Sequence, residues 1–360
     1  MIVERTNYFA KPGHAAEVLA IRRRACAVRV KIGLAAGKVF VKQDGDGADV
    51  TWECGFATKD EHERDLAACA ASKDFEAVRA AMKQHIVRFE RHLERRDVEP
   101  LANGMIDTDV TGIRAVAREV TFRSGNHTLK GYLHLPPGEG LFPCMITNHG
   151  SGISQGTWDV SRPATALLLM SWGIASFLPH RHGYGNSPGP AWRSEVTAEF
   201  GTSEYDTQLA ARLDRESDDV IAAFDMLASM PELRPDHIGV MGSSFGGTNT
   251  LLAASKSPKF RCAVEFAGAA MNWDRTPALR ALMTQAAAKV SQPIFFIQAA
   301  NDYSIRPTKE LAASLDGTGK VVESRIYPDF GVNRDEGHRL ESMGQAVWGA
   351  DVRRFLERWL

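Results

Sequence analysis

The chain has 360 residues, with 43 Lys and Arg against 44 Asp and Glu, a formal net charge of −1, and a hydrophobic fraction of 44%. At roughly 100–200 residues per domain, this length predicts two domains or one large domain with an appendage. The balanced charge excludes a polycation, so nothing points to nucleic acid or an anionic membrane as a partner.

The five cysteines are widely scattered and form no CxxC pair, so the sequence predicts neither a disulfide framework nor a zinc site. Residues 1–6 lack the apolar core of a secretory signal. The longest mostly apolar run, residues 164–178, is shorter than the roughly 18–20 residues of a membrane span. We therefore expect a reduced, cytoplasmic protein that holds no metal.

Residues 1–96 read as a small α+β domain. An extended segment at 2–9 ends at Lys11-Pro12-Gly13, and residues 15–32 have apolar positions at helical spacing. Strands are expected at 38–42 and 50–57 around Asp-Gly turns, followed by helices at 58–71 and 74–85, with Thr58 and Glu61 as a capping box. This order fits a ferredoxin-like domain.

The strand Glu4-Arg5-Thr6-Asn7-Tyr8, the turn Lys11-Pro12-Gly13 and the central hairpin resemble the dimeric α+β barrel superfamily, especially its NIPSNAP-like members. The resemblance implies a homodimer formed through this domain. Some relatives are oxygenases or bind haem, which leaves open a separate chemistry for this domain. His14 and His62 belong to no spaced cluster of ligands, so we expect both to be solvated surface residues.

A charged stretch and the break at Pro100 place a linker at 97–116. From 117 to 360 short apolar strands alternate with helices, one of them at 216–230. Residues 120–123 and 129–135 suggest an antiparallel pair. The pattern predicts an α/β domain whose mostly parallel, eight-stranded sheet is flanked by helices, with function at the carboxyl ends of the strands.

The strand at 238–241 leads into Gly242-Ser243-Ser244-Phe245-Gly246 and then into a helix of small residues. A serine in such a tight strand-to-helix turn needs small residues two positions away on each side, and the turn lifts its hydroxyl above the sheet. Ser244 is therefore the nucleophile candidate. The alternative is a glycine-rich turn that only permits close packing.

A serine nucleophile needs a general base and an acid that orients it. Asp302 follows the apolar strand at 294–297 and is the acid candidate, although an aspartate there can also simply close a turn. His338 follows the last strand and is the base candidate, with His180 and His182 as weaker competitors. The order Ser, Asp, His is that of α/β hydrolases.

An acyl-transfer site also needs donors for the oxyanion. The strand at 144–147 ends in Asn148-His149-Gly150-Ser151-Gly152. We assign the oxyanion hole to the backbone N–H of Phe245 and to that of Gly150 or Ser151. His149 is expected to steady the loop and not to act as a second base.

Residues 118–360 resemble the α/β-hydrolase superfamily, most closely its dienelactone hydrolase-like and prolyl oligopeptidase-like branches. The matching segments are Asn148 to Gly152, Arg181-His182-Gly183-Tyr184-Gly185, Gly242 to Gly247, Asn301-Asp302 and Glu336-Gly337-His338. Dienelactone hydrolases proper have cysteine at the elbow, whereas this chain has Ser244. The departure favours a serine esterase over a true dienelactone hydrolase.

Four residues are candidates for the substrate pocket: Arg181, His182, Tyr184 and Trp273. Arg181 would pair with a substrate carboxylate or, alternatively, tie its loop to the fold. Trp273, together with Trp158 and Trp192, would wall an apolar pocket or fill the core. Residues 188–213 are long for a connection and are a candidate lid.

The sequence thus predicts a serine hydrolase without a cofactor that cleaves a carboxylic ester of a small organic substrate through an acyl-enzyme. Two alternatives remain. The same triad would serve an amide, peptide or C–C bond, because pocket shape chooses the leaving group. A non-catalytic dimeric binding protein on a hydrolase fold is the other.

Overall fold

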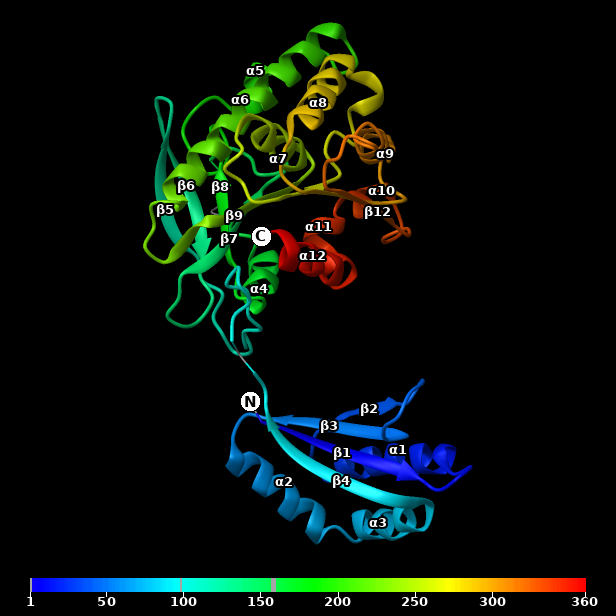
Figure 1. The fold of residues 1–360 in the computed structure, drawn as a ribbon. Coiled ribbons are helices and arrows are strands. Elements are labelled where there is room, and N and C mark those ends of the chain that lie inside the picture. Colours follow the sequence, from blue (N-terminus) through cyan, green and yellow to red (C-terminus); the bar gives the residue numbers. More distant parts are fainter. Residues whose placement is uncertain (1, 98, 157–159) are drawn as a thin grey trace. The chain divides into compact units, whose positions relative to one another are not determined.

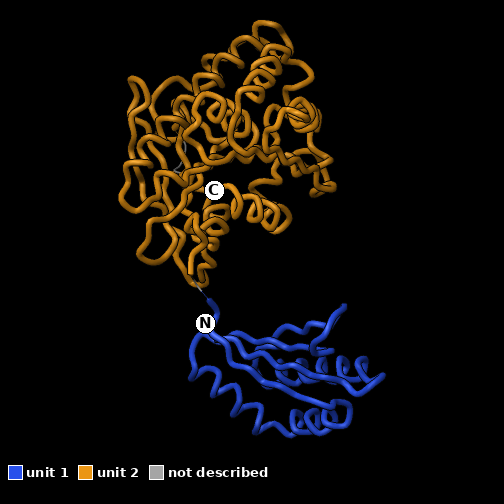
Figure 2. The backbone as a smooth tube through the Cα atoms, viewed as in Figure 1, with its two compact units in different colours: residues 1–98 blue, residues 99–360 orange. Residues whose placement is uncertain are grey.

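The computed structural model describes residues 2–97, 99–156 and 160–360. The chain divides into two compact units, Met1–Val98 and Glu99–Leu360 (Figure 2). None of the helices in the described residues is long and apolar enough to cross a membrane.

The first unit is a four-stranded antiparallel sheet with helices on one face (Figure 1). The strand order is β2-β3-β1-β4, so β3 lies between the two strands that α1 connects, and β1 lies between β3 and β4. This is a split β-α-β arrangement, although the sequence predicted no strand in this unit after residue 85, where β4 lies. Its elements are β1 (Ile2–Ala10), α1 (Ala15–Lys31), β2 (Lys38–Val41), β3 (Val50–Phe56), α2 (Lys59–Ala71), α3 (Lys73–His85) and β4 (Ile86–Arg95).

Of the two histidines expected at the surface of the first unit, His62 is buried and His14 is half-buried. His62 is only 7% exposed, and its Nε2 lies 2.6 Å from Oε2 of the buried Glu4. His14 is half-buried, with its Nδ1 2.8 Å from Nδ1 of His85. The expectation that His62 is solvated was wrong because α2 turns this ring toward the sheet, where it contacts the buried carboxylate of Glu4.

The second unit contains a mixed sheet of eight strands in the order β12-β11-β10-β9-β7-β8-β6-β5. The pairs β5·β6 and β6·β8 are antiparallel, and the others are parallel. The strands are apolar along nearly their whole length because both faces of the sheet are buried. The strands are β5 (Arg118–Ser124), β6 (His127–His134), β7 (Phe142–Asn148), β8 (Ala175–His180), β9 (Leu233–Ser243), β10 (Ala263–Phe266), β11 (Ile294–Ala299) and β12 (Val322–Tyr327).

Helices cover both faces of this sheet (Figure 1). One core cluster unites the sheet with the helices α6 (Ser203–Leu227), α7 (Phe245–Lys256), α8 (Pro277–Lys289) and α9 (Arg306–Ala313). The other cluster lies against α4 (Pro163–Ser171) and α12 (Gln345–Trp359). Shorter helices are α5 (Trp192–Glu195), η1 (Trp273–Arg275), α10 (Arg334–His338) and α11 (Leu340–Met343).

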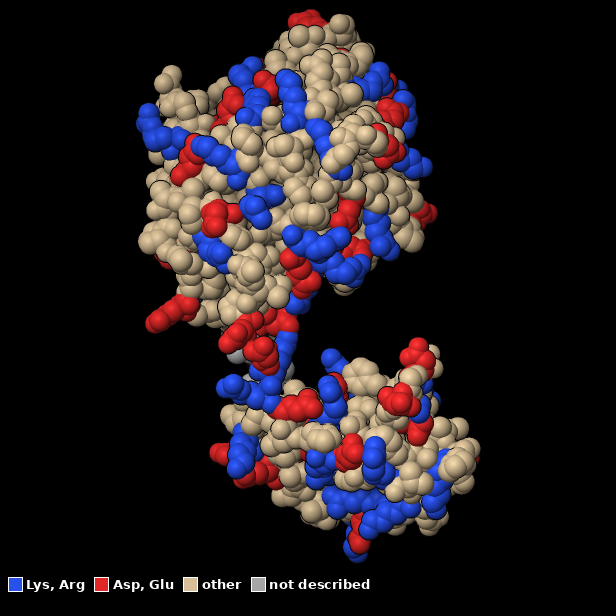
Figure 3. All heavy atoms as spheres, viewed as in Figure 1, with Lys and Arg blue, Asp and Glu red and all other residues tan. Residues whose placement is uncertain are grey.

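On the visible surface of the second unit, acidic and basic side chains are interspersed (Figure 3).

Part of the segment expected to be a linker is packed into the second unit. Met105 is 2% exposed in the cluster beneath α4 and α12. The Ile106 N–H donates to the Trp172 carbonyl at 3.0 Å, and Asn103 Nδ2 donates to the Leu356 carbonyl at 3.2 Å. The second unit therefore begins at Glu99. The segment is mostly polar, but the apolar side chain of Met105 is buried against the sheet of this unit.

Helix α6 also differs from expectation, since it starts at Ser203 and not near 216. Thr202 caps it by accepting from the Tyr205 N–H. Residues 203–213 of the candidate lid therefore form the first turns of a helix whose Leu209 and Leu213 are buried.

Candidate active site

Ser244 occupies a strained turn between β9 and α7. Its backbone has φ 60° and ψ −125°, a left-handed conformation that costs energy in a residue with a Cβ. A Cβ on Gly242 would come within 2.5 Å of the Gly246 carbonyl oxygen, and a Cβ on Gly246 would overlap the backbone of Asn148. Both glycines are thus required by close approach, as expected for a nucleophile elbow.

His338 and Asp302 are joined by a hydrogen bond. Nδ1 of His338 lies 2.9 Å from Oδ1 and 3.1 Å from Oδ2 of Asp302. Because a carboxylate only accepts, Nδ1–H donates, and Nε2 is left as the basic nitrogen. Nε2 of His338 is buried and has no partner among the described residues.

Asp302 is held by two further donors that the sequence did not reveal. Nε2 of Gln298, from the end of β11, lies 2.8 Å from Oδ2, and the Tyr303 N–H lies 2.6 Å from Oδ1. The ring of Tyr303 meets that of His338 edge-on, with centroids 5.6 Å apart. The acid is therefore fixed from several sides, and it orients the imidazole in turn.

Asn301 links the loops that carry the acid and the base. Its Nδ2 donates to the carbonyls of Phe330 and Asn333, and its Oδ1 accepts from the Phe330 N–H at 2.9 Å. This cross-link explains why asparagine precedes the aspartate.

The sheet brings the three candidates to one edge. Ser244, Asp302 and His338 follow β9, β11 and β12, which run parallel, with β10 between β9 and β11. Among the described residues no hydrogen bond joins the Ser244 hydroxyl to another group. In free enzymes such catalytic contacts are often long and shorten only with substrate.

The loop after β7 lies against the nucleophile. A Cβ on Gly150 would be 3.2 Å from Cβ and 3.7 Å from Oγ of Ser244, so a larger residue here would press against Ser244. The His149 ring is fully buried, with Nδ1 2.7 Å from the Gly150 carbonyl oxygen, and burial together with the Arg181 charge lowers its pKa well below the usual value. His149 is thus neutral and supports the loop that carries Gly150 and Ser151.

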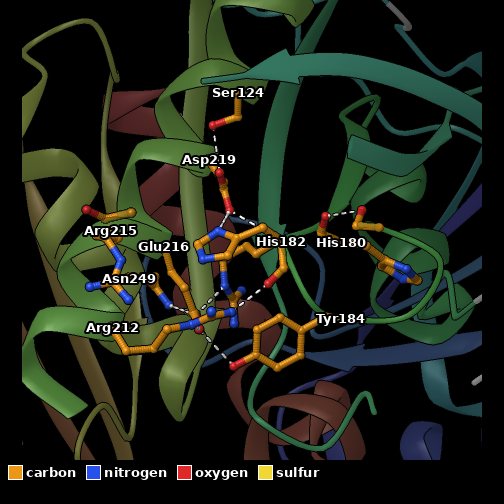
Figure 4. Close-up of polar contacts among 12 residues, drawn as sticks. Ser124, His180, His182, Tyr184, Arg212, Arg215, Glu216, Asp219 and Asn249 are labelled. Carbon is orange, nitrogen blue, oxygen red and sulfur yellow. Dashed lines mark hydrogen bonds and ion pairs between the residues drawn. The ribbon is translucent and has the colours of Figure 1, made fainter. Parts of the chain in front are cut away.

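Behind this loop lies a buried ion network centred on Glu216 of α6 (Figure 4). Arg181 Nε and Arg212 Nε donate to its two oxygens at 2.8 and 2.7 Å, and the Tyr184 hydroxyl and Asn249 Nδ2 donate at 2.9 and 3.1 Å. Burial alone would raise the pKa of Glu216, but the two guanidinium charges outweigh it and lower that pKa. The carboxylate is therefore ionised in the interior.

The network reaches both sides of the nucleophile. Arg181 Nη2 donates to the His149 carbonyl at 2.8 Å, in the loop after β7. Asn249 Nδ2 also donates to the Phe245 carbonyl at 2.9 Å, in the first turn of α7. Glu216 thus connects the loop after β7 with the helix that carries the elbow.

Two of the four candidate pocket residues, Arg181 and Tyr184, belong to the Glu216 network. Arg181 and Tyr184 are fully buried, so the Arg181 guanidinium is not available to a substrate carboxylate. Trp273 is 1% exposed and donates to Glu310 at 2.9 Å. Their proposed contact with substrate is therefore corrected: the loop after β8 folds inward because its charges are paired there. Trp158 lies outside the described residues.

His182 belongs to a second chain of hydrogen bonds (Figure 4). Its Nδ1 lies 2.6 Å from Oδ2 of Asp219, whose Oδ1 accepts from the Ser124 hydroxyl at 2.6 Å. The carboxylate stands between serine and histidine, so His182 cannot deprotonate Ser124 through this chain. The arrangement ties β5 and the loop after β8 to α6, and His182 is a structural residue.

Glu265 on β10 is a buried acid that sequence reasoning missed. Its Oε1 accepts from the Gly268 N–H. Burial, aided by the nearby Asp302 charge, raises the pKa of Glu265 to about 8. At neutral pH the Glu265 carboxyl is therefore protonated and uncharged, so it adds no second negative charge close to Asp302.

Residues 194–338 match the dienelactone hydrolase family, a stretch that includes Ser244, Asp302 and His338. No curated protein matches the chain. The acylaminoacyl peptidase of Pyrococcus horikoshii is similar in structure, with 18% identity, a TM-score of 0.52, and coverage of 69% of this chain and 42% of the peptidase. An esterase of Pyrococcus furiosus has 17% identity, a TM-score of 0.51, and coverage of 74% of this chain and 98% of the esterase.

At these identities the structural matches establish the fold alone, and this chain spans only about two fifths of the peptidase. The strand order, the turn at Ser244 and the family match agree with one another. The second unit therefore has the α/β-hydrolase fold, and its residues 194–338 match the model of the dienelactone hydrolase family.

Proposed function

We propose that the chain is a serine hydrolase that cleaves a carboxylic ester of a small organic substrate. The observation that carries the proposal is the strained backbone of Ser244 beside Gly150, on the same sheet edge as the bonded pair His338 and Asp302. A strained backbone at a residue with a Cβ persists only where its surroundings enforce it, and such residues cluster at active sites.

In the proposed reaction, Nε2 of His338 takes the Ser244 proton as Oγ attacks the ester carbonyl. The N–H groups of Phe245 and of Gly150 or Ser151 would stabilise the oxyanion. The imidazolium, stabilised by Asp302, then protonates the leaving alkoxide as the C–O bond breaks. Water, deprotonated by His338, releases the acid and restores Ser244.

Replacement of Ser244 by alanine tests the proposal. We expect turnover of p-nitrophenyl acetate and butyrate to fall at least about a thousandfold, with an unchanged circular dichroism spectrum. Ser255→Ala, on the same helix, is the matched control and should retain activity. Undiminished activity in Ser244→Ala would refute the role of this serine.

The choice of leaving group requires a substrate panel. Matched p-nitrophenyl esters and p-nitroanilides of the same acyl groups would compare ester and amide cleavage at one site. We expect the esters to be preferred, since Ser244 replaces the cysteine of dienelactone hydrolases proper. Preference for the anilides would favour the peptidase alternative, and failure of Ser244 to react with a fluorophosphonate would favour a binding protein.

We also propose a cytoplasmic homodimer formed through the first unit, which rests on the resemblance of that unit to dimeric α+β barrels. Sedimentation velocity of the full chain should give a species of twice the 39.5 kDa chain mass. A monomer at micromolar concentration would contradict this proposal.

A further inference from the structure

The first unit contains a cavity of about 430 Å³ between its sheet and its helices. This volume lies within the roughly 300–1,000 Å³ typical of small-molecule sites. The walls include Trp52, Phe75, Met82 and Phe89. Phe89 belongs to the edge strand β4 and is 46% exposed, so the cavity has an open side there.

The ionisable side chains in the lining are predominantly cationic. Five are arginine or lysine, and two, Glu4 and Asp65, are acids. Both acids already have partners. Asp65 accepts from Arg29 Nη1 and Nη2 at 2.9 and 2.6 Å, and Glu4 lies 2.6 Å from His62 and 3.1 Å from Arg91 Nε. An excess of positive charge therefore faces the cavity.

Arg22 differs from these paired groups. It is 4% exposed, and in the described residues no carboxylate forms an ion pair with it. Its Nη1 donates to the Tyr8 hydroxyl at 3.0 Å, its Nη2 has only the Cys26 thiol at 3.7 Å, and its Nε has no acceptor. The guanidinium lies 4.5 Å from the centre of the Trp52 ring.

A buried guanidinium without a counterion is costly, because the charge has lost water and gained no ionic partner. Nε and Nη2 form one edge of the fork, the edge that binds a carboxylate through two parallel hydrogen bonds. On Arg22 this edge has only a weak thiol contact. The site therefore lacks an anion and offers an aromatic and aliphatic wall beside it.

We propose that this cavity binds a small carboxylic acid, with its carboxylate on the Nε and Nη2 edge of Arg22 and its apolar body against Trp52, Phe75 and Met82. The lining comes entirely from the first unit. The proposal therefore does not depend on the hydrolase reaction of the second unit.

The test uses the full chain labelled with 5-fluorotryptophan, since Trp52 is the sole tryptophan in residues 1–98. Trp52→Phe identifies its fluorine resonance. Benzoate, 2-naphthoate and octanoate are titrated separately, with 2-naphthalenemethanol as the neutral analogue. We expect at least one acid to shift the Trp52 resonance saturably, and the alcohol to bind at least about tenfold more weakly than 2-naphthoate.

Arg22→Met should weaken binding of the acid at least about tenfold and leave the affinity for the alcohol unchanged. Arg24→Met, an exposed position on the same helix, is the matched control. If Arg22→Met loses its folded fluorine spectrum, Arg22→Lys takes its place, and the loss of the fork should still weaken binding severalfold. The proposal is overturned if no acid shifts the Trp52 resonance, or if acid and alcohol bind equally well, or if the substitutions at Arg22 leave acid binding unchanged.

Discussion

At the scale of single residues, the site depends on how Asp302 is held. Three donors surround its carboxylate: His338 Nδ1, Gln298 Nε2 and the Tyr303 N–H. A carboxylate with this many donors keeps one orientation and fixes the tautomer of the histidine.

Asp302→Asn should lower kcat about 10³–10⁴-fold while leaving the fold intact, because an amide in this position can stabilise the wrong imidazole tautomer. Steady-state hydrolysis of p-nitrophenyl butyrate measures the effect. Asp316→Asn, beyond the end of α9, is an exposed control and should behave as wild type. A loss of less than tenfold in Asp302→Asn would show that another residue is the acid.

Glu265 should make stability depend on pH. Its pKa is raised to about 8 in the fold, against an ordinary value near 4.5 in the unfolded chain. Between these values the folded state holds a proton that the unfolded state has lost, so stability falls as pH rises, by up to about 1.4 kcal/mol per pH unit. Below about 4.5 and above about 8 this contribution no longer changes.

Urea unfolding of wild type and Glu265→Gln from pH 4 to 9 tests this expectation. The variant keeps an acceptor for the Gly268 N–H but does not titrate, so the stability difference should change between pH 4.5 and 8 and stay constant outside. Parallel curves for the two proteins throughout would show that Glu265 does not titrate in this window.

At the scale of elements, the network around Glu216 joins α6 to the loops after β7 and β8 and to α7, which follows Ser244. The elbow is strained, and strain persists only where its surroundings enforce it. Arg181 on the loop after β8 and Asn249 on α7 both bond to this one carboxylate, and Arg181 also donates to the His149 carbonyl on the loop after β7.

Glu216→Gln should destabilise the protein by about 3–5 kcal/mol, because it leaves two buried guanidiniums without their shared counterion. Glu204→Gln, exposed on the same helix, should change stability by less than about 0.5 kcal/mol. Thermal and urea unfolding measure both. A cost below 1 kcal/mol in Glu216→Gln would mean that the interior does not depend on this charge.

At the scale of the whole molecule, the two units have separate cores. The proposed triad and oxyanion residues all belong to the second unit, and the Arg22 cavity belongs to the first. Each unit therefore carries its own proposed site.

The boundary between the units can be tested with two fragments. Residues 99–360 should retain wild-type kcat on p-nitrophenyl butyrate. Residues 117–360 should be less stable by at least about 2 kcal/mol, because they lack Met105, which is buried beneath α4 and α12. Equal unfolding midpoints for the two fragments would contradict a structural role for residues 99–116.

The sequence by itself determined the alternation of strands and helices in the second unit and the identity of Ser244, Asp302 and His338 as candidates, but not β4 or the start of α6. These features can be recognised from short segments of sequence: glycines around a turn, apolar runs, and the order of motifs along the chain. Only the tertiary structure decided that Arg181 and Tyr184 are interior residues, that His62 is buried, that Met105 is packed into the second unit, and that Arg22 forms no ion pair with any described residue. Burial and charge pairing depend on contacts between residues far apart in the chain, such as Glu4 with His62 and Arg181 with Glu216, and no local pattern encodes which charges meet.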